Sequence, residues 1–298
     1  MNKFYRSLVV ISGVFAVLTC VVSAKTTTPA ETSGILYKIT GHGLTKPSYL
    51  FGTVHVICKQ DMFSADKLGG YLDQTDRLVM EIDLDDMGEI ADMAKGLSLP
   101  EGKTLKTILT AEQYAKVDEM VTNALGFSAD RVQTFSPVAL QVMILSSPKM
   151  LGCTSPSAYE ILLTQLADTK KKPIEGLETA AFQRSVVDKL PIEAQAKALY
   201  EMALDPMKSV NDFKQLIAVY KLQDSEKLYE TIGTQLGSNT DMESQLVGAR
   251  NKTWVPKIEA MIKEKPTFIA VGGGHLGGKI GLVASLRGLG YKVEAVKL

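Results

Sequence analysis

The chain has 298 residues, of which 45% are hydrophobic and 22% are charged, and its 33 Lys and Arg balance its 33 Asp and Glu. These fractions are close to the averages of soluble globular domains, which argues against a fibrous, repetitive or disordered protein. The balanced charge, with no basic stripe among the aromatic residues, also argues against nucleic acid as a partner.

The first 24 residues have the pattern of a secretory signal peptide. Two basic residues precede an uncharged apolar run over residues 8–22, and small residues follow up to Ala24. This pattern predicts cleavage after Ala24 and export of a single domain, residues 25–298, to a periplasm or the extracellular space. The run is shorter than the roughly 20 residues that a membrane span needs, so we expect no stable membrane span in the mature chain.

The remaining sequence alternates between strand-type and helix-type patterns. Residues 40–47 read as a hairpin loop between the first two strands, and a Thr110-Ala111-Glu112-Gln113 capping pattern opens the first long helix. We predict strands at residues 35–39, 48–54, 77–83, 173–177, 267–271 and 292–296. We predict helices at residues 110–125, 157–167, 178–189, 192–204, 207–220, 225–236, 240–252 and 278–287. The expected fold class is α/β, with a mixed β-sheet formed from N- and C-terminal strands and a long helical middle region.

The mature chain would keep two cysteines, Cys58 and Cys153. In an oxidising compartment, a pair of cysteines favours one disulfide, which would tie the loop after His55 to the turn around Cys153. Two small buried thiols are the alternative.

Two of the three histidines end glycine-rich segments. Gly52-Thr53-Val54-His55 follows one apolar run, and Gly272-Gly273-Gly274-His275 follows another. Each histidine is therefore expected where a strand gives way to a loop, which is where open α/β sheets build their sites. The two imidazoles could converge on one metal ion or one reacting group. The third histidine, His42, lies between glycines in the hairpin loop, and we assign it no role.

Two acidic residues could join these histidines. Glu81 ends an apolar strand at the level of His55, with Asp83 on the same face by alternation. Glu178 stands where a strand turns into a helix that carries Gln183. Alternatively, Glu178 is a helix N-terminal acid that favours the helix dipole.

Arg250 and Asn251 are predicted to close a polar helix. An arginine can clamp a carboxylate or stabilise an oxyanion, and Asn251 would add a neutral donor beside it. The alternative is a cation on the surface at a helix C-terminus.

In this order, the motifs resemble the TraB/GumN family, which includes the TIKI proteases. The resemblance extends from residue 36 to residue 296 and rests on these segments: Leu50-Phe51-Gly52-Thr53-Val54-His55, Val79-Met80-Glu81-Ile82-Asp83, Lys172-Pro173-Ile174-Glu175-Gly176-Leu177-Glu178-Thr179 with Gln183, Arg250-Asn251, Val271-Gly272-Gly273-Gly274-His275-Leu276-Gly277-Gly278 and Gly290-Tyr291-Lys292-Val293. It implies a metal-dependent hydrolase, with TIKI members acting on peptide substrates with a divalent cation such as manganese or cobalt. The paired GxxH motifs then correspond to His55 and His275, the acidic motif to Glu81 and the family arginine to Arg250. Glu178 matches the family's GLE element.

The chemistry expected from these residues is metal-assisted hydrolysis of a peptide or protein substrate. A divalent cation, Mn, Co or Zn, would be held by His55, Glu81 and His275. Glu178 would accept the proton of the attacking water, and Arg250 with Asn251 would stabilise the oxyanion. The sequence contains no HExxH, GxSxG or Walker-type segment, so the common zincin, serine-hydrolase and P-loop chemistries are not expected.

Two other functions stay open at this point. Gly272 to Gly274 could form a phosphate-binding turn at the start of a helix, as in nucleotide binders. The protein could also be a secreted, non-catalytic peptide- or metal-binding protein.

Overall fold

The computed structural model describes residues 33–235 and 244–298. The predicted signal peptide, residues 1–24, lies outside the described residues, as do residues 240–243 of one predicted helix. In the described part of the chain, no helix is both long and apolar enough to cross a membrane.

A six-stranded mixed sheet forms the centre of the described chain, in the order β6-β4-β7-β2-β1-β8. Strands β6, β4, β7 and β2 run parallel, whereas β1 is antiparallel to both of its neighbours. The carboxyl ends of the four parallel strands therefore meet at one edge of the sheet. The strands are β1 (Leu36–Thr40), β2 (Ser48–Thr53), β4 (Arg77–Met80), β6 (Ile174–Gly176), β7 (Thr267–Gly272) and β8 (Lys292–Val296).

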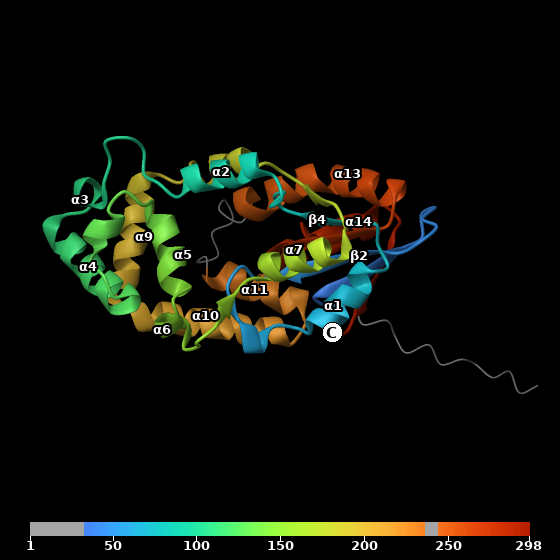
Figure 1. The fold of residues 1–298 in the computed structure, drawn as a ribbon, viewed down its shortest axis with the longest axis horizontal. Helices are drawn as coiled ribbons and strands as arrows, with labels where there is room; N and C mark the ends of the chain where they lie inside the picture. The colour runs from blue at the N-terminus through green and yellow to red at the C-terminus, as the bar shows by residue number, and fades with distance from the viewer. Residues whose placement is uncertain (1–32, 236–243) are drawn as a thin grey trace, which may run out of the picture. The chain divides into compact units, whose positions relative to one another are not determined.

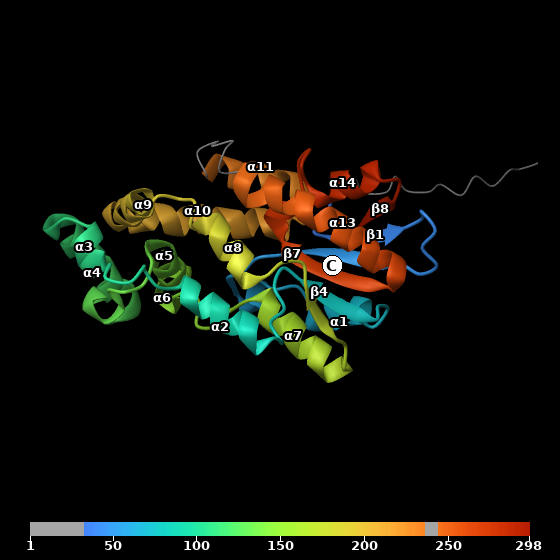
Figure 2. The ribbon, with the colours of Figure 1, turned by 90° about the horizontal axis from the view of Figure 1, so that it is seen from above.

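Helices cover both faces of the sheet (Figures 1 and 2). Leu50 packs with the helices of one face, and its neighbours Tyr49 and Phe51 pack with those of the other, because successive side chains of a strand point to opposite faces. Burial on both faces explains why these strands read as continuous apolar runs. One face packs against α13 (Ala249–Glu264) and α14 (Leu282–Gly288). The other packs against α1 (Ala65–Leu72), α7 (Tyr159–Lys170), α10 (Pro206–Lys221) and α11 (Ser225–Gln235).

A further group of helices has its own apolar core, and we call it the helical cluster. Its first long helix begins at the predicted capping box, in which Thr110 and Gln113 bond each other's backbone N–H, and ends at Gly126 with φ +80°. The cluster consists of α3 (Leu105–Ile108), α4 (Ala111–Leu125), α5 (Pro137–Leu145), α6 (Pro148–Leu151) and α9 (Ile192–Leu204). Two more helices, α2 (Met87–Gly96) and α8 (Ala180–Val187), lie against each other between the cluster and the sheet (Figure 2).

The expected mixed α/β architecture is thus confirmed, but several predicted boundaries were wrong. The strand predicted to reach residue 83 ends at Met80. The alternation of a strand therefore does not extend to Asp83 and does not put it on the same face as Glu81. Asp83 accepts a hydrogen bond from the backbone N–H of Asp85. The helix predicted from residue 157 starts at Tyr159, because β5 (Pro156–Ser157) pairs with β3 (Ile57–Cys58). The helix predicted from residue 278 starts at Leu282.

Two other predicted boundaries were wrong at candidate residues. Helix α8 starts after its N-cap Thr179, so Glu178 lies in the preceding loop and is not a helix-terminal acid. The predicted helix 240–252 does not end there: a π-helical turn (Ser244–Gly248) leads into α13, which continues to Glu264. Pro256 lies inside this helix, where it has no N–H to donate to the backbone oxygen of Lys252. Arg250 and Asn251 therefore open a buried helix rather than close an exposed one.

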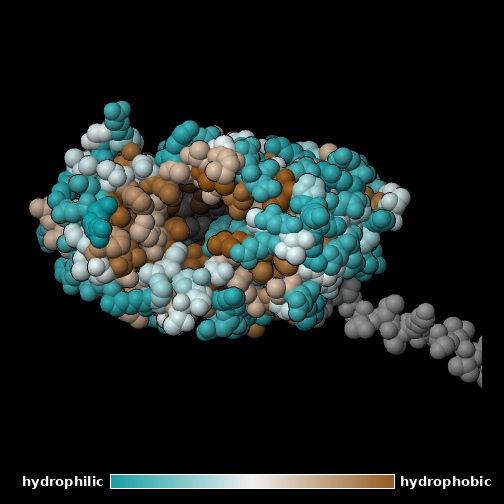
Figure 3. Space-filling view, in the orientation of Figure 1, coloured by the Kyte–Doolittle hydropathy of each residue, from teal (hydrophilic) through white to brown (hydrophobic). Residues whose placement is uncertain are grey.

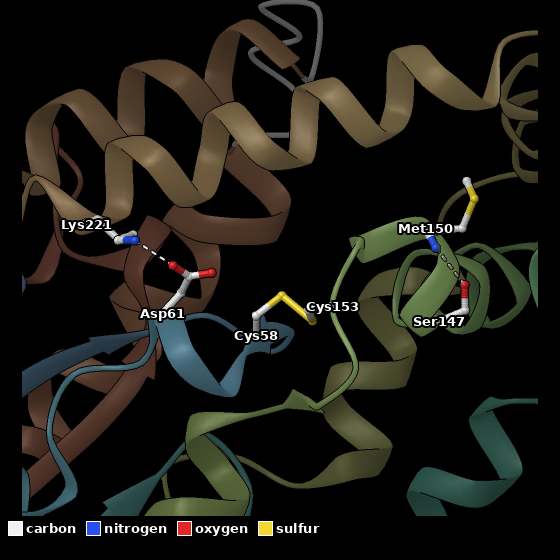
Figure 4. Close-up of a disulfide and its surroundings, with 6 residues drawn as sticks. All are labelled: Cys58, Asp61, Ser147, Met150, Cys153 and Lys221. Atoms are coloured by element: carbon white, nitrogen blue, oxygen red, sulfur yellow. Dashed lines mark hydrogen bonds and ion pairs between the residues drawn. A yellow bond between two sulfur atoms is a disulfide. The ribbon is translucent and has the colours of Figure 1, made fainter.

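The predicted disulfide between Cys58 and Cys153 is present, with the two Cα atoms 6.1 Å apart (Figure 4). It joins the β3 loop, just after His55, to the turn between α6 and β5. The loop after one candidate histidine is therefore fixed to the helical cluster.

Candidate functional site

The carboxyl ends of the four parallel strands each carry one of the predicted residues. His55 follows β2, His275 follows β7, Glu81 follows β4 and Glu178 follows β6. In parallel α/β sheets this edge is where ligand sites form, because the loops there open away from the covered faces. Four segments that are distant in sequence thus meet at one place.

Gly272 lies at the centre of this edge. Its backbone N–H donates to Oε1 of Glu81 at 2.7 Å. A Cβ on this glycine would lie 3.2 Å from Oε1 of Glu81, 3.7 Å from Nε2 of His55 and 3.7 Å from Cδ2 of His275. The three predicted metal ligands therefore surround a small space that a side chain at position 272 would fill.

Arg250 links the buried charges of the site. Its Nη2 donates to Oε2 of Glu81 at 2.5 Å and to Oε1 of Glu178 at 2.6 Å. Its Nη1 donates to Nε2 of His275 at 3.2 Å, and the indole of Trp254 stacks on the guanidinium and donates to Oε2 of Glu178 at 2.9 Å. Arg250 is only 8% exposed, which excludes the alternative of a surface cation.

Asn251 orients His275. Its Oδ1 accepts a hydrogen bond from Nδ1 of His275 at 2.7 Å, which assigns the imidazole proton to Nδ1 and leaves the Nε2 lone pair towards the site. Its Nδ2 donates to the backbone oxygens of His275 and Ile280. Both ends of this amide are therefore engaged by the protein. The geometry favours a positioning role for Asn251 over the predicted one of an oxyanion donor.

A similar difference applies to Glu178. Both of its carboxylate oxygens accept hydrogen bonds, one from Arg250 alone and the other from Arg250 and Trp254. Its side chain is 3% exposed. The geometry therefore favours a role for Glu178 in holding Arg250. The predicted role as proton acceptor would need a carboxylate oxygen without a donor, and both oxygens of Glu178 have donors.

Glu160, in the first turn of α7, is a residue that the sequence reasoning missed. Its Oε1 accepts hydrogen bonds at 2.9 Å from Nδ1 of His55 and from Oγ1 of Thr53. A carboxylate on Nδ1 fixes the ring orientation and directs Nε2 to the site, as in carboxylate–histidine–metal arrangements. The predicted disulfide could have revealed it, because a link between Cys58 and Cys153 brings the segment containing Glu160 close to the loop after His55.

The charged groups of the site change one another's pKa values. Burial raises the pKa of Glu81, but the positive charges that face it, those of His275, Arg250 and His55, together with the N–H of Gly272, lower it to about 2. Burial lowers the pKa of His275 to about 4, although Glu81 acts in the opposite direction. At neutral pH we expect a carboxylate at Glu81 and a neutral imidazole at His275.

His55 differs from His275. Partial burial lowers its pKa, but the hydrogen bond and charge of Glu160 outweigh this and raise it above its usual value. The side chain of His55 is 65% exposed, so water weakens this ion pair. We expect His55 to be protonated and paired with Glu160 at neutral pH.

A pocket of about 320 Å³ opens at this edge of the sheet. Four of its lining residues are the polar His55, Glu81, Glu160 and Gln183, and Gln183 donates to Oε2 of Glu81 at 3.1 Å. The rest of the lining is mostly apolar: Thr53, Met80, Ile82, Leu84, Met93, Leu163 and Ala270. Few polar groups converging in an apolar pocket are typical of a small-molecule or substrate site.

The donor atoms can be compared with the needs of a divalent cation. Two imidazoles and a carboxylate around an open space suit manganese, cobalt or zinc in kind. Nε2 of His55 has no hydrogen-bond partner among the described residues, but Nε2 of His275 accepts from Arg250. In residues 33–235 and 244–298, no group of three or more His, Cys, Asp or Glu side chains is close enough to hold a metal ion. The donor set fits by chemistry and location, and coordination would require Arg250 to release His275.

The phosphate-binding alternative does not fit this geometry. The N–H of Gly272 is bonded to a carboxylate, which would repel a phosphate. The turn Gly273–His275 also does not run directly into α14, which begins only at Leu282. His42, as expected, lies away from this edge, with its ring against Tyr291.

Comparison with known proteins identifies the family of the chain. It is 24% identical over 302 residues to a Xenopus tropicalis protein named Metalloprotease TIKI2, covering 83% of this chain and 57% of that protein. It is 22% identical over 305 residues to an Amphimedon queenslandica protein named Metalloprotease TIKI homolog, covering 85% of this chain and 60% of that protein. The chain thus spans less than two thirds of the length of these relatives, and no solved structure matches it. The profile of the TraB/PrgY/gumN family matches residues 35–295, which include every candidate residue and all of the central sheet except Val296 at the end of β8. The chain belongs to that family.

Proposed function

We propose that the protein is a metal-dependent hydrolase that cleaves peptide bonds in the pocket at the carboxyl edge of the sheet. The observation that carries the proposal is the convergence of His55, Glu81 and His275 around the space left by Gly272. The names of the two relatives, both metalloproteases, support it. His55, Glu81 and His275 are the residues that would hold the cation.

A neighbouring side chain orients each of the two histidines. Asn251 keeps the Nε2 lone pair of His275 directed to the site, and Glu160 orients His55, which would give up its Nε2 proton on binding a cation. A bound divalent cation would supply Lewis-acid activation of the scissile carbonyl and lower the pKa of water. If His275 held a cation through Nε2, Arg250 would lose its hydrogen bond to that atom, and its Nη1 could donate to the developing oxyanion.

We assign the proton acceptor to Glu160 in place of Glu178. Glu160 lines the pocket, and its Oε2 is buried and accepts no hydrogen bond from the described residues. This oxygen has room for a proton, whereas both oxygens of Glu178 are occupied by donors from Arg250 and Trp254. Glu178 then acts through Arg250, which it positions.

The first test is metal binding by the purified chain. Residues 25–298 are stripped of metal and titrated with Mn, Co and Zn, beside His55→Ala and His275→Ala. His42→Ala is the matched control, because His42 is the one other histidine in the chain and lies in an exposed loop. We expect stoichiometric binding by the parent and by His42→Ala, and loss of binding in the other two variants. Binding that persists in both site variants would refute the ligand set.

The second test is turnover of peptide substrates by the metal-loaded protein. We expect cleavage by the parent and by His42→Ala, and loss of at least about a hundredfold in activity in Glu160→Gln, the size typical of a general base. Activity that is equal in the parent and in His275→Ala would contradict the proposal, provided that both proteins melt at similar temperatures.

A non-catalytic peptide- or metal-binding protein is the second candidate. The observation that favours it is the pairing of Arg250 with Glu81, Glu178 and His275. These hydrogen bonds give all four side chains a partner without a cation. Saturable metal or peptide binding with no product under any metal would establish this function instead.

We also propose that the chain is exported and that residues 25–298 are its mature form. The signal-type pattern of residues 1–24 and the disulfide between Cys58 and Cys153 support this, because disulfides persist mainly in oxidising compartments. N-terminal sequencing of the protein recovered outside the cytoplasm should begin at Lys25. An intact N-terminus would contradict the proposal.

A further inference from the structure

A second, larger hollow lies beside the candidate site. It has a volume of about 510 Å³ and is lined by parts of α2, α5 and α8, by the segment that follows α2 and by the start of α9. Met93 of α2 and Gln183 of α8 line both this hollow and the pocket that contains His55 and Glu81. We call it the apolar groove, and Figure 3 shows hydrophobic residues around the opening in this region.

The groove is lined by apolar side chains that have no partner covering them. Met93, Leu97 and Val142 are 41%, 47% and 52% exposed. Helix α2 buries none of its residues, although Met87 and Ile90 continue the same apolar stripe along it. Leaving such a stripe in water costs about 25 cal/mol per Å² compared with covering it, and large exposed patches mark interaction sites.

The charged side chains of the groove are already paired with protein groups. Asp92 accepts from Lys95 at 2.5 Å, and Arg184 lies 3.9 Å from Asp188 and donates to the backbone oxygen of Asp92. Each charged side chain that lines the groove thus has an opposite charge or a backbone oxygen beside it. This arrangement matches an uncharged apolar segment and not an acidic or basic one.

We propose that the apolar groove binds apolar side chains of the peptide substrate next to the bond to be cleaved. The inference rests on the proposed function, because the groove shares Met93 and Gln183 with the pocket of the candidate site, and the Gln183 side chain donates to Glu81. A chain that lies along α2 and α5 would cover Leu97 and Val142 and bring its backbone past the pocket. The substrate class is thus a peptide with a short run of residues such as Leu and Val.

The test measures binding and cleavage separately. The probes are two fluorescein-labelled peptides, Ser-Gly-Leu-Val-Leu-Gly-Ser and Ser-Gly-Ser-Thr-Ser-Gly-Ser, and binding to the full mature chain is followed by fluorescence anisotropy. We expect the Leu-Val-Leu peptide to bind at least about tenfold more tightly than the Ser-Thr-Ser peptide. Leu97→Arg and Val142→Arg should remove this preference. Leu222→Arg is the matched control, because Leu222 is 58% exposed and does not line the groove.

His275→Ala separates the groove from the chemistry. It should keep the preference for the Leu-Val-Leu peptide while losing cleavage, which would support the inference. Preferential binding by the parent without any cleavage would refute the proposed hydrolase and leave the groove as a peptide-binding site. Equal affinity for the two peptides, or a preference unchanged in both Leu97→Arg and Val142→Arg, would overturn the inference.

Discussion

Replacing Arg250 by Met tests whether the charges at the sheet edge depend on one another. Met keeps an unbranched apolar side chain at this position but removes the guanidinium that stacks on Trp254. Two carboxylates, Glu81 and Glu178, would then remain buried without the cation that pairs with both.

The structure sets the size of the effect. The side chains of Arg250 and Glu81 are each 10% exposed and that of Glu178 is 3% exposed, so water cannot replace the lost pairing. Removing one partner of a buried ion pair costs about 3–5 kcal/mol. For a protein of this size, that corresponds to a melting temperature lower by roughly 6–20 °C.

The assay is guanidinium denaturation at pH 7, with two further variants. Arg184→Met is the matched control, because that arginine is 35% exposed and forms a weak pair with Asp188, and should cost less than about 1 kcal/mol. Adding Glu178→Gln to Arg250→Met removes one of the two unpaired charges and should recover part of the lost stability.

The pH dependence provides an independent check. The pKa of Glu81 is lowered from 4.5 to about 2, so its contribution to stability is present above pH 4.5 and is lost as the pH falls towards 2. The stability difference between the parent and Arg250→Met should therefore be largest near neutral pH and shrink below pH 4.5. A difference under about 1 kcal/mol at pH 7, with no recovery from Glu178→Gln, would refute the buried-charge reasoning.

Three further predictions concern the surroundings of the site. Glu160→Gln should lower the pKa of His55 in chelator-containing buffer, because the charge that raises it is removed, and an NMR titration that shows no change would contradict this. Gly272→Ala should abolish metal binding, since the added methyl would lie 3.7 Å from Nε2 of His55. It should shift the melting temperature by only a few degrees, because the backbone at this position suits any residue. Undiminished metal affinity would exclude this space as the binding site. Replacing Cys58 and Cys153 by Ser should lower the free energy of unfolding by about 2–4 kcal/mol, because the bond closes a loop of 95 residues; urea denaturation within about 0.5 kcal/mol of the parent would argue against the link.

The sequence was informative wherever local pattern and strand topology agreed. Apolar runs followed by glycine and histidine predicted the ends of β2 and β7, and parallel strands have only one edge at which those ends can meet. Strand topology also predicted the position of Glu81 at this edge, although its strand was predicted three residues too long. The site edge depends on strand order and not on the terminal residue of any strand.

The roles of Asn251, Glu178 and Glu160 could not be predicted from the sequence in this way. They depend on which atoms a side chain contacts across the fold, and Arg250 illustrates the problem. A polar composition predicted that a helix ends at residue 252, whereas Trp254 and the buried charges pack within a helix that continues to Glu264. Tertiary contacts override local propensity when they satisfy groups that would otherwise be buried without partners.

The charge count at the sheet edge bears on what the site can hold. Glu81 and Glu178 together carry two negative charges, and Arg250 supplies one positive charge, while His275 is neutral at pH 7. One negative charge is therefore left over in a buried place. Hydrogen bonds from Gly272 and Gln183 to Glu81, and from Trp254 to Glu178, stabilise it without a ligand, and a ligand of opposite sign would compensate it further. His55 brings a positive charge only when protonated and is already paired with Glu160, so the proposed cation would add the positive charge that Glu81 and Glu178 do not receive from Arg250 alone.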